Sequence, residues 1–270
     1  MNGFVRGHSI ETAADCLPNF PAGYREHAPP AHAAHAVECV WRSVSVHAER
    51  VPVDPDGCVD VLLRWTKASH EAPVTHAVSI VGAMSRSEIV SVNTGDIHIG
   101  VRFRPGWAAS LLRAPVDHFT DRVRPLDRYA HLDPESLIRA VVRVEHFDAL
   151  ASAVCAFVTP APPDADEIQR AIDALVRSHG RLSLNALSDI ANLGERQFRR
   201  VCIARTGLSP KRLARVLRFR NLTIALRASP PAPMSEVAAA HGYSDQSHMI
   251  RDARQLSGRT PVALSAARGA

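Results

Sequence analysis

Eight side chains that can bind bases or phosphates occur in two short stretches near the C-terminus. The first stretch reads ERQFRRVCIARTG (195–207) and the second reads SDQSHMIRDARQLSG (244–258). Arginine can bind guanine or phosphate through two hydrogen bonds, and the glutamine amide can pair with adenine. The sequence therefore predicts contacts with duplex DNA from Arg196, Gln197, Arg199, Arg200, Gln246, Ser247, Arg251 and Arg254.

Both stretches belong to a longer pattern that occurs twice. LSDIANLGERQFRRVCIARTGLSP (187–210) and VAAAHGYSDQSHMIRDARQLSGRTP (237–261) each contain a short helix, a turn, a second helix and then Gly-x-Ser/Thr-Pro. The pattern is typical of a helix-turn-helix unit, whose second helix enters the major groove with its N-terminus first. We expect Ser244 to cap the second of these recognition helices, and Arg259 to contact the DNA backbone.

Residues 167–265 resemble the DNA-binding domain of AraC/XylS-type transcription regulators. The resemblance rests on GLSPKRL, VLRFR and TIALR after the first unit and on EVAAAHGYSDQSHMIR and GRTP in the second. It implies two helix-turn-helix units joined by a long helix at about residues 210–228, specific binding of promoter or operator DNA, and contact with RNA polymerase if the protein is an activator. The sequence departs from the family where a serine cap or larger apolar side chains are common, at Gly194, Cys202, Met249 and Ala253.

Charge divides the chain into two parts. Residues 168–270 contain 17 Lys and Arg against 6 Asp and Glu, whereas residues 1–167 contain 15 against 21. The resulting net charges of +11 and −6 suit a DNA-binding domain beside a separate regulatory domain. The sequence has no apolar run of roughly 18 residues and no signal peptide, and its five cysteines form no CxxC pair, so we expect a cytoplasmic protein.

The predicted fold class is α+β with more than one domain. The segment TPAPPDADE (159–167) is rich in proline and acidic residues and predicts a linker that we place at residues 159–166. It separates an N-terminal sensing or dimerisation domain at residues 1–158 from the DNA-binding domain at residues 167–270. The DNA-binding domain should be all-helical, with about seven helices, because its apolar residues recur at helical spacing.

Stretches rich in valine and isoleucine predict strands in the N-terminal domain. We expect a β-barrel-like fold with flanking helices. The sequence NTGD (93–96) predicts a hairpin loop between two of the strands. The sequence PGWAASLLRA (105–114) predicts a helix with Pro105 near its first turn.

Two motifs of the N-terminal half, PVDPDGCVDVLLRW (52–65) and GVRFRPGWAASLL (100–112), resemble an uncharacterised domain found on some AraC-type regulators. Their charged residues form a candidate effector site that consists of Asp56, Asp60, Arg102 and Arg104. Two interpretations are open: a structural ion pair that fixes a turn, or an arginine that binds an anionic group of a small-molecule effector. Cys58 in the same motif is expected to pack as a small buried residue.

Other chemistries have less support in the sequence. His32, His35 and Cys39 have the spacing of one helix face, which would suit a metal or thiol sensor, but they lie among alanines before a predicted strand. The motifs G-x-S-x-G and H-E-x-x-H are absent, so we predict no catalytic residue, metal or cofactor. Three alternatives stay open: an enzymatic or DNA-repair N-terminal domain on the same DNA-binding module, a helical protein-interaction module, and a homodimer.

Overall fold

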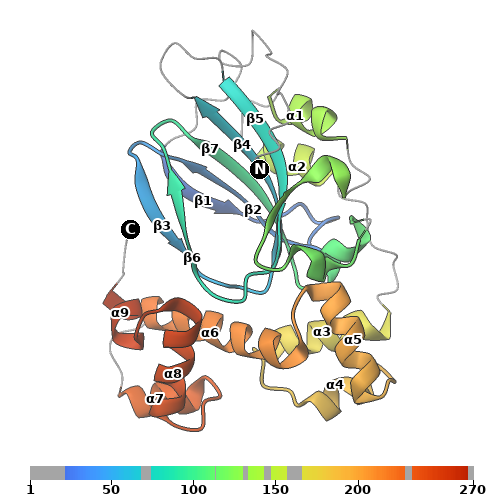
Figure 1. Ribbon diagram of the computed structural model, residues 1–270, viewed down its shortest axis with the longest axis vertical. Coiled ribbons are helices and arrows are strands. Elements are labelled where there is room, and N and C mark those ends of the chain that lie inside the picture. Colours follow the sequence, from blue (N-terminus) through green and yellow to red (C-terminus); the bar gives the residue numbers. More distant parts are fainter. Residues whose placement is uncertain are drawn as a thin grey trace.

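The computed structural model describes residues 22–67, 74–112, 114–129, 133–142, 147–156, 166–228 and 233–266. Strands occur in the N-terminal half, and the C-terminal half is helical (Figure 1). The predicted linker at residues 159–166 lies outside the described residues except for Asp166, which caps the first C-terminal helix. In the described part of the chain, no helix is both long enough and apolar enough to span a membrane.

The N-terminal half contains a six-stranded antiparallel sheet and a separate two-stranded sheet (Figure 1). In sheet order, the six strands are β1 (Gly23–His27), β2 (Val37–Val44), β7 (Ile97–Phe103), β4 (Val59–Lys67), β5 (Val74–Val81) and β8 (Val123–Pro125). The second sheet pairs β3 (Glu49–Val53) with β6 (Glu88–Val92). The predicted sheet-rich domain is confirmed, and its barrel is open, because β1 and β8 do not pair within the described residues.

One face of the six-stranded sheet forms the core of this half. Val61 of β4 is buried and lies opposite the buried Val101 of β7. Alternate residues of a strand share one face, so the buried Val59, Val61, Leu63 and Trp65 of β4 form a continuous apolar surface. This surface packs in one core with Leu137 of α1 (Pro134–Val142) and with residues of α2 (Phe147–Cys155).

Two local predictions in this half are wrong. The loop at residues 93–96 connects β6 to β7, which belong to different sheets, so it does not close a hairpin. In the described part of PGWAASLLRA, the only helix is the short 3-10 helix η1 (Trp107–Ser110). Gly106 precedes η1 with a φ of 88°, and a β-carbon there would lie 2.4 Å from Oε1 of Gln169. This segment therefore turns tightly against the C-terminal half instead of extending as an α-helix.

The C-terminal half contains seven helices in the described residues 166–228 and 233–266, as predicted. They are α3 (Glu167–Arg177), α4 (Leu184–Ile190), α5 (Glu195–Thr206), α6 (Pro210–Ala228), α7 (Met234–Ala240), α8 (Gln246–Ser257) and α9 (Pro261–Ala266). The 19-residue α6 joins the helix-turn-helix unit α4–α5 to the unit α7–α8 (Figure 1). Its Leu213 and Phe219 are buried, so one face of α6 packs against the rest of the protein.

The two recognition helices begin differently. The Asp245 carboxylate accepts a hydrogen bond from the His248 amide at 2.7 Å and caps α8. The prediction that Ser244 is this cap is wrong, because the turn before α8 is longer than the turn before α5. Five residues separate α7 from α8, whereas four separate α4 from α5. Gly194 occupies the cap position of α5 and provides no side-chain hydrogen bond.

Candidate nucleic-acid interface

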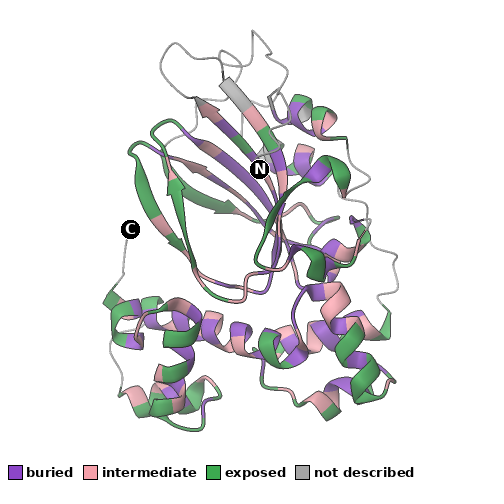
Figure 2. Ribbon diagram, viewed as in Figure 1, coloured by how far each residue is buried: buried purple, intermediate pink, exposed green. Residues whose placement is uncertain are grey.

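Figure 2 shows exposed and buried positions along both recognition helices, α5 and α8. All the side chains that the sequence predicts to contact DNA are exposed. These exposed residues are Arg196, Gln197, Arg199 and Arg200 of α5, and Gln246, Ser247, Arg251 and Arg254 of α8. The opposite faces are buried, with Phe198 and Cys202 in α5 and Met249 and Ala253 in α8. Each helix therefore presents its polar face to solvent while its apolar face holds it in the domain.

Ion pairs fix each recognition helix to a neighbouring helix. Arg205, in the last turn of α5, donates a hydrogen bond at 3.0 Å to Asp166, the cap of α3. Arg215 of α6 donates to the Asp252 carboxylate of α8 at 2.8 and 3.1 Å. The Asp252 side chain is only 7% exposed, so solvent screens this pair little and its loss would leave a buried charge without a partner.

Arg259 does not belong to the exposed polar face of α8. Its Nη2 donates a hydrogen bond at 2.6 Å to the carboxylate of Asp54, which lies in the N-terminal half. The guanidinium is therefore already paired within the chain. The expected contact of Arg259 with the DNA backbone gives way to an ion pair between the two halves.

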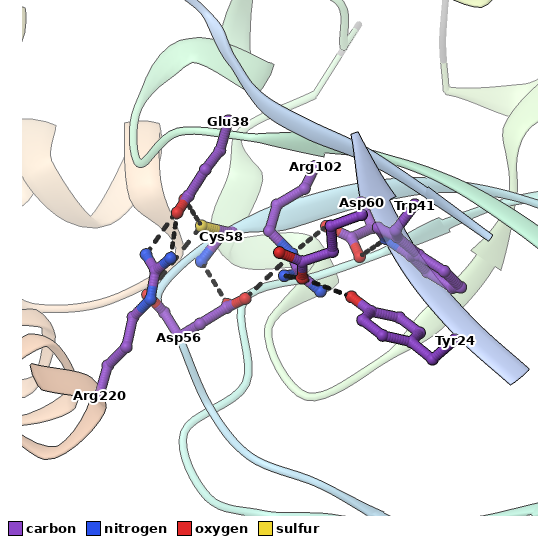
Figure 3. A network of polar contacts seen from close by, with 9 residues as sticks. Tyr24, Glu38, Trp41, Asp56, Cys58, Asp60, Arg102 and Arg220 are labelled. Atoms are coloured by element: carbon purple, nitrogen blue, oxygen red, sulfur yellow. Dashed lines mark hydrogen bonds and ion pairs between the residues drawn. The ribbon is translucent and has the colours of Figure 1, made fainter. Parts of the chain in front are cut away.

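A second polar site lies on the six-stranded sheet, where three of the four candidate effector residues meet (Figure 3). Arg102 of β7 forms ion pairs with Asp56 at 3.1 Å and with Asp60 of β4 at 3.4 Å. Its Nη1 also donates a hydrogen bond at 3.1 Å to Glu26 of β1. Three carboxylates thus surround one guanidinium, as expected for a structural ion-pair network.

Arg104, the fourth candidate, has a different environment. It follows the last residue of β7, and its Nε donates a hydrogen bond at 3.2 Å to the carbonyl of Ala34. The structure therefore does not unite the two arginines in one site. Residues 102 and 104 would share one face if the strand continued, but β7 ends at Phe103.

The possible metal group does not form on a helix face. Cys39 belongs to strand β2, and the residues around His32 and His35 form turns, so the helical spacing does not apply. The His35 ring lies 5.1 Å from the ring of Trp107. Among the residues that the structure describes, no group of three or more His, Cys, Asp or Glu side chains could hold a metal ion.

A tryptophan covers part of the sheet network. Trp41 Nε1 donates a hydrogen bond at 2.9 Å to Asp60 (Figure 3). A β-carbon at Gly100 would lie 2.1 Å from the Trp41 ring, so glycine allows the indole to lie across β7. Burial raises the pKa of Asp60 to about 6; the charge of Arg102 opposes this shift and that of Asp56 adds to it. The Asp60 carboxyl therefore titrates close to neutral pH.

The network continues from the sheet to α6 of the C-terminal half (Figure 3). Arg220 of α6 donates two hydrogen bonds to the Glu38 carboxylate of β2, one of them at 3.1 Å. The Cys58 thiol donates to the same carboxylate at 3.2 Å, and the Cys58 amide donates to Asp56 at 2.8 Å. Burial would raise the pKa of Glu38, but hydrogen bonds and charge from Arg220 hold it below its usual value. Cys58 is buried, which confirms the prediction of a packed residue. Burial also raises the pKa of the thiol, which disfavours a reactive thiolate.

Several members of this network carry no recognisable signal in the sequence. They are Tyr24, Glu26, Glu38, Trp41 and Arg220. Glu38 and Arg220 are 182 residues apart in the chain, so no local pattern connects them. Glu38 is the exception in one respect, because it is an acidic residue in a strand rich in apolar residues, and a charge at such a position needs a partner that the sequence does not identify.

Two family models match the chain. Residues 187–267 match a family described as "Helix-turn-helix domain", and residues 25–125 match a family described as "Domain of unknown function (DUF6597)". The first match contains both recognition helices, and the second contains most of the six-stranded sheet with Arg102. The comparison with curated proteins found no match.

The solved structures that are similar to this chain include AdpA, AraT and ToxT. The DNA-binding domain of AdpA, a global transcriptional factor in complex with a target DNA, is 22% identical over 38% of this chain and 93% of its own, with a TM-score of 0.36. The C-terminal domain of AraT, a response regulator from Geobacillus stearothermophilus, is 18% identical over 40% of this chain and 91% of its own, with a TM-score of 0.37. ToxT from Vibrio cholerae is 9% identical over 88% of this chain and 96% of its own, with a TM-score of 0.43.

The family matches agree with the geometry. Two helix-turn-helix units expose equivalent polar faces, and the matched helix-turn-helix domain contains both. The N-terminal match confirms the resemblance that the motifs at residues 52–65 and 100–112 indicate. Residues 187–267 therefore form an AraC-type helix-turn-helix domain, and residues 25–125 form a domain of the uncharacterised family.

Proposed function

We propose that the chain binds its DNA site as a monomer, with α5 and α8 in two successive major grooves on one face of the duplex. The observation that carries this proposal is the exposure of two equivalent polar helix faces whose opposite faces are buried. A recognition helix places its N-terminal residues against the base edges. Successive major grooves on one face lie about 34 Å apart, so we infer two contact patches about 10 base pairs apart.

The exposed side chains divide into two roles in this proposal. Arg196 and Gln246 lie in the first turns of α5 and α8, where they can reach base edges and pair with guanine and adenine respectively. Arg254 lies farther along α8 and contacts phosphate. The remaining residues supply further base or phosphate contacts: Gln197, Arg199, Arg200, Ser247 and Arg251.

We propose that the N-terminal domain regulates this binding, either by taking up a small-molecule effector or by forming a homodimer. The polar contacts that run from Arg102 through Asp56 and Cys58 to Glu38 and Arg220 support this role, because they connect the sheet to α6. An anionic effector at Arg102 would have to displace bound carboxylates. If it does so, Arg102→Met abolishes the effector response and preserves DNA affinity.

We further propose that the protein acts in the cytoplasm without turning over a substrate, and that it contacts RNA polymerase if it activates transcription. The rival proposal is an enzymatic or DNA-repair N-terminal domain that uses the same DNA-binding module. Turnover assays and zinc analysis of the full chain distinguish the two, because stoichiometric zinc or product formation would favour the rival.

Selection of duplexes from a random-sequence pool by the full chain, followed by footprinting, tests the proposed function. Arg196→Ala and Gln246→Ala should each weaken specific binding by about 1–3 kcal/mol and relax base preference in different patches. Arg139→Gln removes an exposed ion pair with Asp133 in the N-terminal half and should bind like the unaltered chain. One protected patch, with Gln246→Ala neutral, would show that α8 does not read DNA.

A further inference from the structure

Each recognition helix ends at a glycine. The N-terminal half contacts the C-terminal end of both helices. Helix α5 ends before Gly207, which has a φ of 78°, and α8 ends before Gly258, which has a φ of 70°. The glycines occupy the same place in the repeated unit, two residues before Ser209 and Thr260. These positions are therefore equivalent points at which another part of the protein can hold the two helices.

The first contact is made by Thr120, which follows the 3-10 helix η2 (Val116–Phe119). Its Oγ1 donates a hydrogen bond at 2.7 Å to the carbonyl of Gly207. A β-carbon at Gly207 would lie 2.6 Å from this hydroxyl and 3.5 Å from the carbonyl oxygen of Val116. The close approach of η2 thus adds to the need for glycine at the end of α5, beyond the positive φ.

The second contact is made by Asp54 and Ser87. Asp54 accepts a hydrogen bond at 2.6 Å from Arg259, the residue after Gly258, and its side chain is 19% exposed. The Ser87 amide donates at 2.6 Å to the carbonyl of Leu256 in the last turn of α8. The end of α8 is therefore attached to the N-terminal half by a partly buried ion pair and by a backbone hydrogen bond.

Helix α6, which connects the two units, is held between these points. Gly57 approaches Leu213 of α6 so closely that a β-carbon would lie 2.8 Å from its Cδ1. Seven residues farther along α6, Arg220 donates a hydrogen bond to Glu38. The N-terminal half thus contacts the connecting helix as well as the ends of both recognition helices.

We propose that the N-terminal domain fixes the distance and relative orientation of the two recognition helices, with Thr120 and Asp54 as positioning residues that act through α5 and α8. This proposal rests on the proposed function, in which both helices bind one duplex. The domain holds the C-terminal ends, so the first turns with Arg196 and Gln246 stay free to enter the grooves. Its consequence is that the protein accepts only one spacing between its two half-sites.

The test uses the full chain and a duplex selected by it from random sequences. Base pairs are inserted between the two protected patches, and each insertion rotates the second patch by about 35° around the duplex axis. We expect an insertion of two base pairs to lower the affinity of the unaltered chain at least about tenfold, because the held helices cannot follow the rotation without deforming the DNA. The double variant Thr120→Val, Asp54→Asn should lose about threefold or less, since its units can adjust.

The variants are chosen to keep the size of each side chain. Thr120→Val removes the hydroxyl that binds Gly207, and Asp54→Asn removes the charge that binds Arg259. Arg139→Gln is the matched control and should keep the full spacing penalty. Circular dichroism establishes that each variant is folded, and the single variants carry the test if the double variant unfolds.

The outcomes separate this inference from the function on which it rests. An equal loss of affinity for the double variant and the unaltered chain, on a site with two protected patches, overturns the positioning role and preserves the proposed function. A selection that enriches no duplex overturns the proposed function and the positioning role with it.

Discussion

Arg254 and Arg259 are residues of the same type in the same basic stretch, but they have different partners. Arg254 is exposed on α8, whereas Arg259 binds Asp54 of the N-terminal half. The sequence alone assigns both to the DNA backbone, because a composition-based argument cannot detect an acidic partner 205 residues away. The fold separates an arginine that is available to phosphate from one whose charge is already compensated.

This difference predicts separate effects on the salt dependence of DNA binding. Arg254→Ala should reduce the slope of log affinity against log salt by about one unit, because one fewer phosphate is neutralised. Arg259→Ala should leave the slope unchanged, since its charge is paired within the chain. The measurement is the affinity for an arbitrary duplex at several salt concentrations, and equal changes for both variants would contradict the assignment.

Asp60 lies in the sheet network, and its carboxyl ionises at a higher pH than an ordinary aspartate. Burial raises its pKa from 3.8 to about 6. A carboxyl whose pKa rises on folding stabilises the folded state fully below the unfolded pKa, and this contribution disappears as the pH rises through the folded pKa. The stabilising contribution of Asp60 is therefore lost as the pH rises from about 4 to about 6.

Replacing Asp60 with asparagine should remove this dependence. Asp60→Asn keeps the shape of the side chain and cannot titrate, so the free energy of unfolding of the variant should rise relative to the unaltered chain by about 2 kcal/mol between pH 4 and pH 7. Urea unfolding at several pH values measures this difference. A difference that does not vary with pH would mean that Asp60 keeps an ordinary pKa in the folded state.

The central part of the sheet network could be predicted from the sequence, and its periphery could not. Asp60 and Arg102 stand out as charges within apolar strands, and the register places them opposite each other. Glu26 joins them only because β1 pairs with β2 so that Glu26 lies opposite Trp41. The order of strands in a sheet depends on long-range pairing, which short motifs do not encode.

At the scale of elements, local patterns predicted the helices better than the turns. The helical period and the capping residues are local features, and they identified all seven described C-terminal helices. The NTGD loop fulfils its turn preference, but its strands diverge into two sheets. The segment at η1 adopts a single 3-10 turn because Gly106 meets Gln169 of α3, a contact that local helix preference cannot anticipate.

The turn at Gly57 links the N-terminal motif to α6 and provides a test at this scale. Gly57 has a φ of 82°, and a β-carbon would lie 2.8 Å from Leu213 Cδ1. Gly95 has a similar φ of 84° with no atom within 4 Å of a β-carbon. We expect Gly95→Ala to lower the free energy of unfolding by about 1–2 kcal/mol through backbone strain, and Gly57→Ala to lower it by a further 1–3 kcal/mol or so through overpacking.

Combining each alanine variant with Leu213→Ala identifies the contact. Removal of the leucine side chain should relieve the overpacking at residue 57, so Gly57→Ala with Leu213→Ala should be less destabilised than the sum of the single changes by more than about 0.5 kcal/mol. Gly95→Ala with Leu213→Ala should be additive within that limit. Urea unfolding measures the free energies of the unaltered chain, the three single variants and the two double variants. Additivity for both pairs would show that the turn does not press on α6.

At the scale of the whole molecule, the charge asymmetry predicted two parts but not how they dock. The acidic N-terminal part and the basic C-terminal part meet through Glu38 with Arg220 and through Asp54 with Arg259. Opposite net charges favour association in general, whereas the individual pairs depend on the folded surfaces of both parts. The docked arrangement makes a stability measurement on one half informative about the other.

The tryptophans make this coupling measurable. All three, Trp41, Trp65 and Trp107, lie in the N-terminal half, whereas the C-terminal half is helical. Tryptophan fluorescence therefore follows the unfolding of the N-terminal half. The helical circular dichroism signal follows mainly the C-terminal half, which our proposal assigns to DNA binding.

We expect a selected duplex to raise the midpoint of thermal unfolding in both signals. A duplex at about 100 times its dissociation constant adds about 2.7 kcal/mol to the free energy of unfolding. In a chain of this size, that amount corresponds to a rise of about 5–11 °C. An unrelated duplex at the same concentration is the control, and Thr120→Val with Asp54→Asn should reduce the rise in fluorescence more than the rise in circular dichroism. A fluorescence midpoint that stays constant while the circular dichroism midpoint rises in the unaltered chain would mean that the two halves unfold independently.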